Sequence, residues 1–331
     1  MSEQINFKEL LSKYTSLITL VLMVVVLSVL TQGRALTWES IRTLLIAESV
    51  RGLAALGVGM IIITRGIDLS VGSVVCLTAS VAASFAQEPT LSNAIYPGVS
   101  FPLFVPIIAG ISVGALCGLI NGLLVAYGKL PPFIATLGMM VMAQGIQLIY
   151  TKAAIVSSLT EPYRAIAQTS LGGPGLRFPV LSVYLIVGII IIYVIMRHTR
   201  QGSNFYAIGG NVNAARVSGI NVEKNLTCVY LYAGILYGIA GVLLSSRLAL
   251  ANALTARGME LDAIAAVTVG GISHSGGVGT VGGMVIGIFT MGLIRYGMSF
   301  MAVNPHFQNL VQGLIIITAV YFDMKKYAKR A

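Results

Sequence analysis

Few side chains in this 331-residue chain have the type and spacing that covalent chemistry requires. His274 and Ser275 are adjacent in the segment GISHSGG, and a serine nucleophile needs a neighbouring base of this kind. The chain has two further histidines, His198 and His306, and His306 is expected on the other side of a membrane. Polar residues in a bend explain the pair better than an intramembrane protease does, so we expect no catalytic residues.

A glycine-rich segment suggests a second kind of chemistry. GVGTVG, with Gly277, Gly279 and Gly282, matches the G-x-G-x-x-G pattern of dinucleotide-binding folds. That interpretation requires a preceding strand and an acidic residue about 20 positions further on, and neither is present. Close packing of helices through small residues is the better explanation, with a structural turn at Gly277 and Gly279.

Patterns that hold cofactors are scarce as well. Cys76, Cys117 and Cys228 stand singly in apolar runs, without the CxxC or Cys/His spacing of a metal or redox site. No G-x-x-x-x-G-K-[ST] sequence occurs, so the chain lacks a P-loop for ATP. We expect no metal or cofactor on this chain, and any ATP-driven function would need another subunit.

Carboxylates inside a membrane usually mark proton or ion paths. Here they are predicted only at span ends or turns, at Asp68, Glu260, Asp262 and Asp323. Glu48 and Arg51 are predicted in the first turns of a span, where an i, i+3 pair explains them. The predicted spans therefore offer no mid-span carboxylate for proton- or sodium-coupled transport.

Neutral polar side chains do occur within predicted spans, at Asn121, Gln144 and Gln147. Amides hydrogen-bond hydroxyl groups without imposing charge, so these residues would suit the path of a neutral sugar or polyol. Hydrogen bonds between neighbouring helices are an equally good explanation.

The elements that must position these residues are membrane spans. Hydrophobic residues make up 56% of the chain and charged residues only 10%, which excludes an ordinary soluble domain. At about 20 residues per span, this is material for roughly nine or ten spans in one domain over residues 1–331. The expected spans are 14–33, 44–64, 69–87, 103–128, 130–151, 178–196, 225–246, two separated by a glycine-rich bend within 263–294, and 296–322.

The positions of lysine and arginine orient these spans. Ten spans place both termini on one side, and with that side cytoplasmic, seven of the eight lysines lie inside. Arginine departs from this bias, because eight arginines fall on the outer half: Arg34, Arg42, Arg51, Arg164, Arg177, Arg247, Arg257 and Arg295. The net charge of +10 is thus explained by membrane topology and not by nucleic-acid binding.

Two longer patterns add to this arrangement. GLLVAYGKLPPFIATL, from Gly122, resembles GLIRYGMSFMAVNPHFQNL, from Gly292, and two related halves are common in transporters. Chance similarity of apolar glycine-rich segments is the alternative. The segment 197–225 is the longest inside loop, and its polar sequence with one short helix at 213–218 favours a docking element for a cytoplasmic partner over a solvated connector.

Five motifs occur in one order along the chain: TRGIDLSVGS (64–73), PPFIATLG (131–138), AIGGNVNAARVSGINV (207–222), ELDAIAAVTVGGISHSGGVGTVGG (260–283) and NPHFQN (304–309). Together they resemble the membrane permease subunit of monosaccharide ABC importers, the group for ribose, galactose and xylose. The ELDAIAA and SGGVGTV stretches look most like the galactose/methyl-galactoside type.

This resemblance implies an all-α polytopic fold of the ten-span importer type with a pseudo-symmetric repeat. It implies a pair of permease subunits, usually identical, in the bacterial inner membrane. A cytoplasmic ATPase would drive transport, and a periplasmic sugar-binding protein would deliver the sugar. The loop between the sixth and seventh spans would couple to the ATPase.

The resemblance also assigns roles to residues. In the coupling loop, the family's GGN-x-x-AA-x-x-SGI stretch is matched by Asn211, Ala214, Ala215, Ser218 and Gly219. The two alanines would present a small face to a cleft in the ATPase. Docking of the binding protein would fall to outer arginines, which pair well with carboxylates: Arg34, Arg42, Arg164, Arg177 and Arg257. Asp68 would cap a helix start.

Two rival functions come from other classes. A stand-alone secondary transporter is disfavoured by the missing mid-span carboxylates and the long inside loop. An intramembrane enzyme is disfavoured by the placement of its three histidines. The sugar stays open among galactose, glucose, ribose, xylose, allose and a furanose signal molecule.

Overall fold

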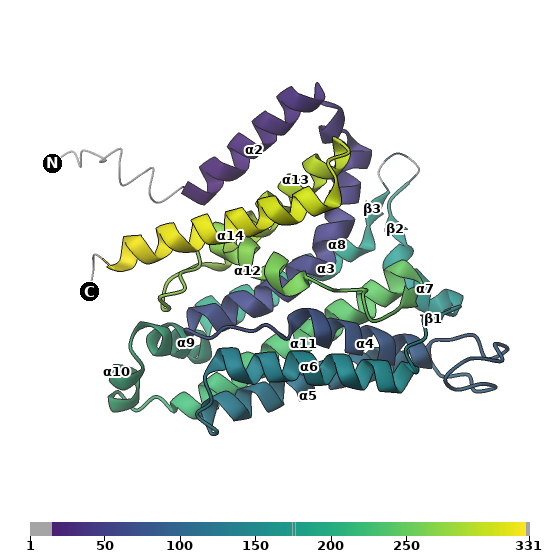
Figure 1. Cartoon of the computed structure of the whole chain (residues 1–331), viewed down its shortest axis with the longest axis horizontal. Coiled ribbons are helices and arrows are strands. Elements are labelled where there is room, and N and C mark those ends of the chain that lie inside the picture. Colours follow the sequence, from purple (N-terminus) through teal and green to yellow (C-terminus); the bar gives the residue numbers. More distant parts are fainter. Residues whose placement is uncertain (1–14, 174, 176, 329–331) are drawn as a thin grey trace.

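The computed structural model describes residues 15–173, 175 and 177–328, and the described chain is mostly helical. Its longer helices are α2 (Thr15–Thr31), α3 (Trp38–Ile63), α4 (Val71–Phe85), α5 (Phe104–Ala126), α6 (Pro132–Thr151), α8 (Val180–His198), α11 (Val222–Leu248), α13 (Val281–Phe300) and α14 (Pro305–Ala328). The shorter ones are η1 (Arg34–Leu36), α7 (Glu161–Gln168), α9 (Arg200–Gly210), α10 (Val212–Val217) and α12 (Met259–Val269). Most of the long helices run across the molecule in roughly the same direction (Figure 1). This is the all-α polytopic architecture that the composition predicts.

Strands within the described ranges are limited to four two-residue pieces. β1 (Val156–Ser157) pairs with β4 (Leu250–Ala251), and β2 (Ser170–Leu171) pairs with β3 (Phe178–Pro179), both in antiparallel fashion. They lie beside α7 at the end of the molecule opposite α9 and α10 (Figure 1). The two strand pairs therefore hold together loops that connect helices, and they do not form a separate sheet layer.

Most predicted spans have a helix at the expected place. Seven helices are long and apolar enough to cross a membrane, by length and composition: α3, α5, α6, α8, α11, α13 and α14. Helices α2 and α4 are apolar but shorter, and α12 has 11 residues. The expected short helix, glycine-rich bend and second helix within 263–294 are confirmed by α12, the loop 270–280 and α13. The described residues thus form nine apolar helices of ten residues or more, of which seven meet the length of a full span, and the count of ten spans stays a prediction.

Two predicted boundaries are wrong. The second span starts at Trp38 and not near Leu44, so Glu48 lies well inside a helix and not in its first turns. Helix α13 also continues through Arg295 to Phe300, where the sequence suggested a break. In both cases the prediction rests on a charged residue, which usually marks the end of a membrane span. The charge is tolerated inside because a partner of opposite sign, contributed by another helix, lies beside it.

The segment 197–225 is also more ordered than predicted. Nearly all of it is helical, with α9 and α10 in place of one short helix. The side chain of Thr199 accepts a hydrogen bond from the backbone of Gly202, and Asn211 accepts one from Ala214. Each therefore serves as an N-cap that starts a helix. Gly202 and Gly209 lie within α9 at points of close backbone contact.

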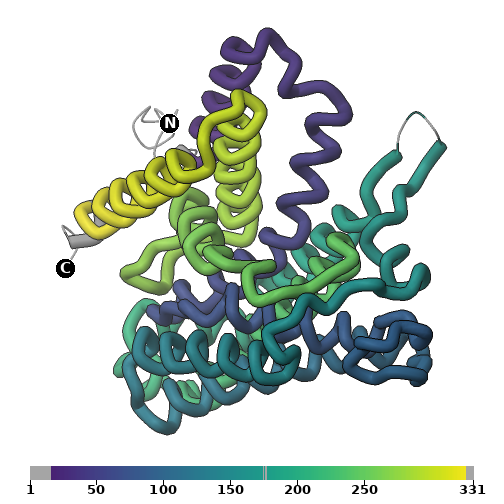
Figure 2. Tube along the Cα trace, turned by 45° about the vertical axis from the view of Figure 1, so that its right-hand side comes forward, coloured from purple at the N-terminus to yellow at the C-terminus, as the bar shows by residue number. Residues whose placement is uncertain are grey.

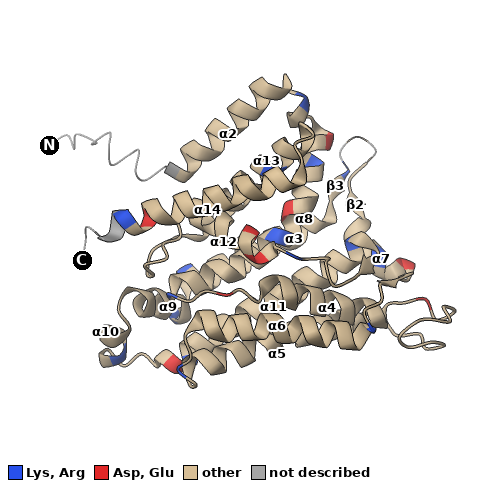
Figure 3. Ribbon diagram, viewed as in Figure 1, with Lys and Arg blue, Asp and Glu red and all other residues tan. Residues whose placement is uncertain are grey.

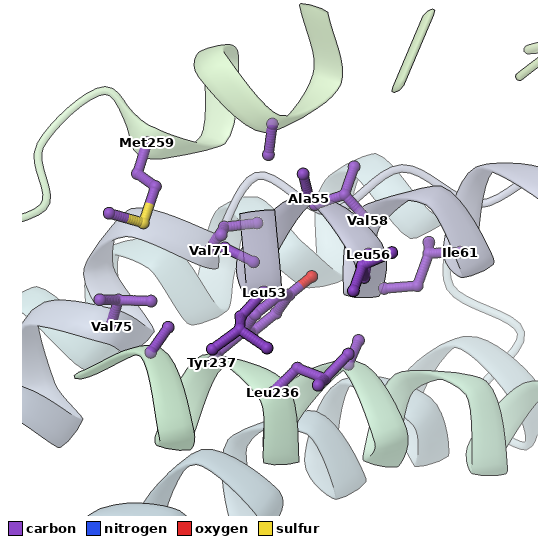
Figure 4. Close-up of a cluster of buried hydrophobic side chains, with 14 of the residues drawn as sticks. Leu53, Ala55, Leu56, Val58, Ile61, Val71, Val75, Leu236, Tyr237 and Met259 are labelled. Atoms are coloured by element: carbon purple, nitrogen blue, oxygen red, sulfur yellow. The ribbon is translucent and has the colours of Figure 1, made fainter. Parts of the chain in front are cut away.

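The core is built around α3. Figure 4 shows Leu53, Leu56 and Ile61 of α3 packed above Leu236 and Tyr237 of α11, all of them nearly or fully buried. Helices α8, α12 and α13 contact α3 as well. Figure 2 shows α2 and the α13–α14 pair rising from a lower group that contains α5 and α6. Helix α3 is therefore the element that both parts of the molecule share.

Helices α5 and α11 pack closely against each other through glycine. Gly114 and Gly118 of α5 lie against Gly234 and Gly238 of α11, and a Cβ at any of these positions would meet the opposite backbone. Small residues permit such contact between helices in a membrane, where association depends on close packing.

The two similar sequence segments form the same local structure. Each is the end of one helix, a short turn and the start of the next, with Pro132 opening α6 and Pro305 opening α14. Each turn contains a residue in the left-handed region, Lys129 in the first and Ala302 in the second. The α5–α6 turn lies on the side of the molecule where α10 lies, and the α13–α14 turn lies on the other side (Figure 1). The two segments therefore have opposite orientations.

Candidate functional site

The segments predicted on the inner side of the membrane gather at one end of the molecule. Arg65, after α3, donates hydrogen bonds to Ser275 and Gly210, and Lys129 forms an ion pair of 2.7 Å with Glu223. Helices α9 and α10 and the end of α14 lie on this same side (Figure 1). We refer to it as the α10 end.

Three stretches far apart in the sequence meet at the α10 end. The Arg65 guanidinium donates to the carbonyl of Ser275 through Nε at 2.6 Å and to that of Gly210 through Nη2 at 2.9 Å. The backbone N–H of Gly277 donates to the carbonyl of Ile63 at 2.8 Å. One residue thus connects the end of α3, the end of α9 and the glycine-rich loop 270–280.

Glycines make this meeting sterically feasible. A Cβ at Gly209 would overlap the carbonyl oxygen of Ile63, and one at Gly276 would overlap the Arg65 side chain. Gly276, Gly277 and Gly279 also have positive φ values of 78°, 69° and 145°. Such values are accessible to glycine at little cost. We call this group the glycine junction, defined by Ile63, Arg65, Gly209, Gly276 and Gly277.

The loop 270–280 is also tied to α14. The Asp323 carboxylate accepts hydrogen bonds from the Ser273 hydroxyl at 3.1 Å and from the backbone N–H of His274 at 2.9 Å. The His274 ring nitrogen Nε2 lies 2.9 Å from the Thr268 hydroxyl. Burial lowers the pKa of His274, and the nearby Asp323 carboxylate opposes that effect. His274 and Ser275 thus have structural contacts in a bend.

The residues assigned to the coupling loop differ in exposure. Asn211 caps α10, and Ala214 is exposed on its surface, as are Ser218 and Gly219 just after its end. Ala215 is only 4% exposed and packs with Ile208 and Val222. The expectation that both alanines face a partner is therefore corrected for Ala215, whose small side chain fills the core of this segment.

Val217 is the surface residue that sequence analysis missed in this segment. It is 90% exposed at the end of α10, beyond the ends of the spanning helices. A β-branched residue between Arg216 and Ser218 carries no distinctive pattern of its own. Only its exposure in the folded structure distinguishes Val217 from other valines of the chain.

The five arginines assigned to docking lie in elements away from α10: η1, the start of α3, α7, the β2–β3 connection and the segment before α12. Arg42 donates to the carbonyl of Arg177 at 3.0 Å and to the Ser170 hydroxyl at 3.2 Å. The structure therefore brings these two arginines together, with Arg42 holding the β2–β3 hairpin. Arg34 and Arg257 are exposed, and Arg164 is partly buried.

A polar cavity of about 330 Å³ opens between α4, α6 and the segment that leads into α12. Its lining residues are Gly72, Ser73, Cys76, Met140, Gln144, Gln147, Ala253, Arg257 and Glu260. Gln147 is 1% exposed and donates from Nε2 to the Ser80 hydroxyl at 3.2 Å, while its Oε1 has no hydrogen-bond partner. Two of the three amides assigned to a translocation path are thus brought together in one cavity with an arginine and a glutamate.

Asn121 belongs to a different group. Its Nδ2 donates to the Ser70 hydroxyl at 3.0 Å, and that hydroxyl donates to Asp68 Oδ1 at 2.6 Å. Asp68 also accepts from the backbone of Ser70 and from the Tyr237 hydroxyl. Asp68 therefore holds the turn before α4, where Ser70 and not Asp68 occupies the N-cap position.

A buried ionic cluster joins α3, α12 and α13. Arg295 forms ion pairs with Glu48 at 2.9 Å and with Asp262 at 2.6 Å, and Arg51 reaches the same two carboxylates at 3.2 and 3.3 Å. Glu48 is 2% exposed. Figure 3 shows charged residues near α3 and α12, inside a largely uncharged bundle. We call Glu48, Arg51, Asp262 and Arg295 the ionic cluster. It corrects the expectation that no carboxylate lies within a span.

The comparison with known families decides what kind of protein this is. A family model described as branched-chain amino acid transport system / permease component matches residues 40–320. The chain belongs to this permease family.

Curated relatives extend over nearly the whole permease. The permease is 39% identical over 295 residues to the galactose/methyl galactoside import permease protein MglC of Escherichia coli strain K12. The match covers 88% of each chain. The permease is 36% identical over 323 residues to the ribose import permease protein RbsC of the same strain, covering 96% of each. The RbsC protein of Bacillus subtilis strain 168 is 36% identical over 326 residues, or 98% of the permease and 97% of that chain. No solved structure matches the permease in the corresponding comparison.

Proposed function

We propose that the permease is the membrane subunit of an ATP-driven importer and forms the path of a monosaccharide across the membrane. The similarity that carries this proposal covers 88% of the chain in a relative named for galactose/methyl galactoside import and 96% in one named for ribose import. Galactose or methyl galactoside is our first choice of cargo. Ribose, xylose, allose or a furanose is the alternative.

The transport cycle that we propose involves alternating access without a covalent step on this chain. ATP and Mg²⁺ are held by a cytoplasmic ATPase, and ATP binding there moves the coupling loop. A periplasmic binding protein delivers the sugar to two permease copies in the bacterial inner membrane. The single domain over residues 1–331 has both termini in the cytoplasm, and lipid surrounds it.

The ATPase contact is proposed on the surface of the segment 197–225. The supporting observation is the 90% exposure of Val217 beyond the ends of the spanning helices. An exposed apolar side chain at the tip of an ordered helix is typical of a surface that a partner covers. Ala214, Ser218 and Gly219 complete this surface, while Asn211 and Ala215 shape it from within.

Docking of the binding protein is proposed at the end opposite α10. Arg34 and Arg177 offer exposed guanidinium groups there, Arg42 holds the hairpin that carries Arg177, and Arg164 lies on nearby α7. Guanidinium groups pair with carboxylates in a bidentate geometry, so an acidic face on the partner would fit. Arg257 is assigned to this surface too, at the mouth of the polar cavity.

The experiment is Val217→Asp in the complex with its ATPase, in proteoliposomes supplied with binding protein. Burial of an unpaired neutral polar group costs about 1–3 kcal/mol, and burial of a carboxylate costs more. We therefore expect binding-protein-stimulated ATP hydrolysis and galactose uptake to fall by about tenfold or more. Val99→Asp is the matched control, because Val99 is exposed in a loop far from α10. The control should retain both activities.

Two results would contradict the proposal. Equal activities for Val217→Asp and Val99→Asp would remove this surface from ATPase coupling. Sugar uptake by the permease without any ATPase would favour a secondary transporter.

A further inference from the structure

The polar cavity differs from the ionic cluster in how its charges are used. In the ionic cluster each carboxylate contacts two arginines. Among the described residues, neither Glu260 nor Arg257 forms an ion pair, although both line the cavity. A half-buried carboxylate in a membrane protein is costly without a partner, and such groups commonly serve function. The free capacity of Glu260 therefore points to a ligand.

Backbone groups fix the position of the Glu260 carboxylate. It interacts with three backbone N–H groups, those of Gly72 in the first turn of α4, of Gly258 and of Glu260 itself. A Cβ at Gly72 would overlap its Oε2 atom, so this approach requires glycine. The N-terminus of a helix favours a negative charge. A carboxylate oxygen accepts more than one hydrogen bond, so capacity remains for a donor in the cavity.

The two amides supply complementary groups from α6. Gln144 and Gln147 lie three residues apart, and both side chains line the cavity. Gln147 is almost fully buried, and its Oε1 is an acceptor without a partner. A buried acceptor of this kind is destabilising unless a donor arrives. The cavity thus combines two amides, a carboxylate and a guanidinium, all of which hydrogen-bond hydroxyl groups.

Charge and size narrow the ligand class. One carboxylate and one guanidinium give the lining no net charge, which disfavours both a free cation and an anionic substrate. A volume of about 330 Å³ is at the lower end of ligand sites and suits a single small ring. Cys76, Met140 and Ala253 offer apolar contacts, and none of the described residues that line the cavity is aromatic. The fit is a neutral, hydroxyl-rich molecule held weakly.

We infer that this cavity is a binding site for the ring hydroxyls of a neutral monosaccharide in transit, with Glu260, Gln147 and Gln144 as the hydrogen-bonding residues. This inference rests on the proposed function and adds the residues that contact the cargo. Asn121 is excluded from the site, because its amide is bonded to Ser70.

The test separates delivery of sugar from coupling to the ATPase. Glu260→Gln and Gln144→Leu are each placed in the permease–ATPase complex in proteoliposomes with galactose-loaded binding protein. We expect ATP hydrolysis within twofold of the unmodified complex and galactose uptake about fivefold lower, so that less sugar enters per ATP. Gln144 is exposed to the cavity, so its variant tests the site where Glu260→Gln fails to fold. Glu161→Gln, at an exposed position on α7, is the matched control.

A direct binding measurement complements the transport assay. Saturation-transfer NMR of galactose with the detergent-solubilised complex, without binding protein, should give a signal that Glu260→Gln removes and Glu161→Gln retains. Unchanged sugar per ATP together with an unchanged NMR signal in both cavity variants would overturn the inference alone. A sodium-dependent uptake lost in Glu260→Gln, without any sugar signal, would replace it with a cation site. If the unmodified complex imports no sugar, the proposed function fails as well.

Discussion

Helix α3 contacts the C-terminal part of the chain in two regions that differ in the kind of interaction, ion pairs in one and backbone contacts in the other. The ionic cluster holds Glu48 by side-chain charges from α12 and α13. The glycine junction holds Ile63, 15 residues further on and about 22 Å along the helix, mainly by backbone contacts. Charged side chains can exchange partners over short distances, whereas a backbone approach through glycine leaves no space for adjustment.

The different contacts indicate where the molecule can move. In the ionic cluster, two arginines share two carboxylates, so partners can alternate while the charges stay neutralised. At the glycine junction, Arg65 and the glycines connect the end of α3 rigidly to α9, next to the surface proposed for the ATPase. We therefore expect a displacement of α10 to move the end of α3 through the glycine junction. The ion pairs of the ionic cluster would then exchange partners as α3 moves.

Arg295→Met gives the largest expected effect. It leaves Arg51 as the one cation of the ionic cluster that Glu48 and Asp262 share, and removal of one partner of a buried ion pair typically costs about 3–5 kcal/mol. We expect a loss of this size in the free energy of unfolding, measured by denaturant titration of the detergent-solubilised permease. Arg34→Met, at an exposed position without an ion pair among the described residues, should change the value by less than about 0.5 kcal/mol.

A double variant sharpens this result. Glu48→Gln combined with Arg295→Met removes one charge of each sign and should recover part of the stability. Equal stability of Arg295→Met and Arg34→Met would show that the cluster is not what holds α3 to α13.

The sequence predicted the positions of the helices better than it predicted the ionic cluster that joins them. Apolar runs located the helices, because burial in lipid and in the core requires hydrophobic residues whatever their partners. Glu48 and Arg295 were placed at helix ends, because a charge within a span is stabilised only by a partner from a distant segment. That partner is 247 residues away, and hydropathy along the chain carries no information about it.

The candidate sites show the same division. The glycines at 277 and 279 were recognised as a turn, but their contacts are backbone atoms of α3 and α9, which leave no signature in the sequence. Gln144 and Gln147 were identified by residue type, since amides are rare within spans. Glu260 was noted only as a span-end carboxylate, because its role depends on the cavity that α4 and α6 complete. Val217 was missed because exposure is a property of the fold.

Gly209→Ala tests the glycine junction with a smaller expected effect. A Cβ there would overlap the Ile63 carbonyl, and overpacking of this kind typically costs about 1–3 kcal/mol. Gly210→Ala is an adjacent control, because a Cβ at that position meets no atom within 4 Å. Thermal unfolding in detergent should show a lower Tm for the first variant only. If both alanines are tolerated alike, the junction is not tightly packed.

Arg65→Lys has the smallest expected effect on stability and asks whether side chains matter at the junction. Lysine keeps the charge but cannot reach both carbonyls in the fixed geometry of a guanidinium, so one hydrogen bond is lost at a cost of about 1 kcal/mol. If the junction transmits movement through this residue, the sugar imported per ATP should fall about threefold while the Tm changes little. Arg200→Lys, at an exposed position on α9, is the control. Unaltered coupling in Arg65→Lys would assign the connection between α9 and α3 to backbone contacts alone, and the rigidity of the junction would then depend on Gly209 and Gly277.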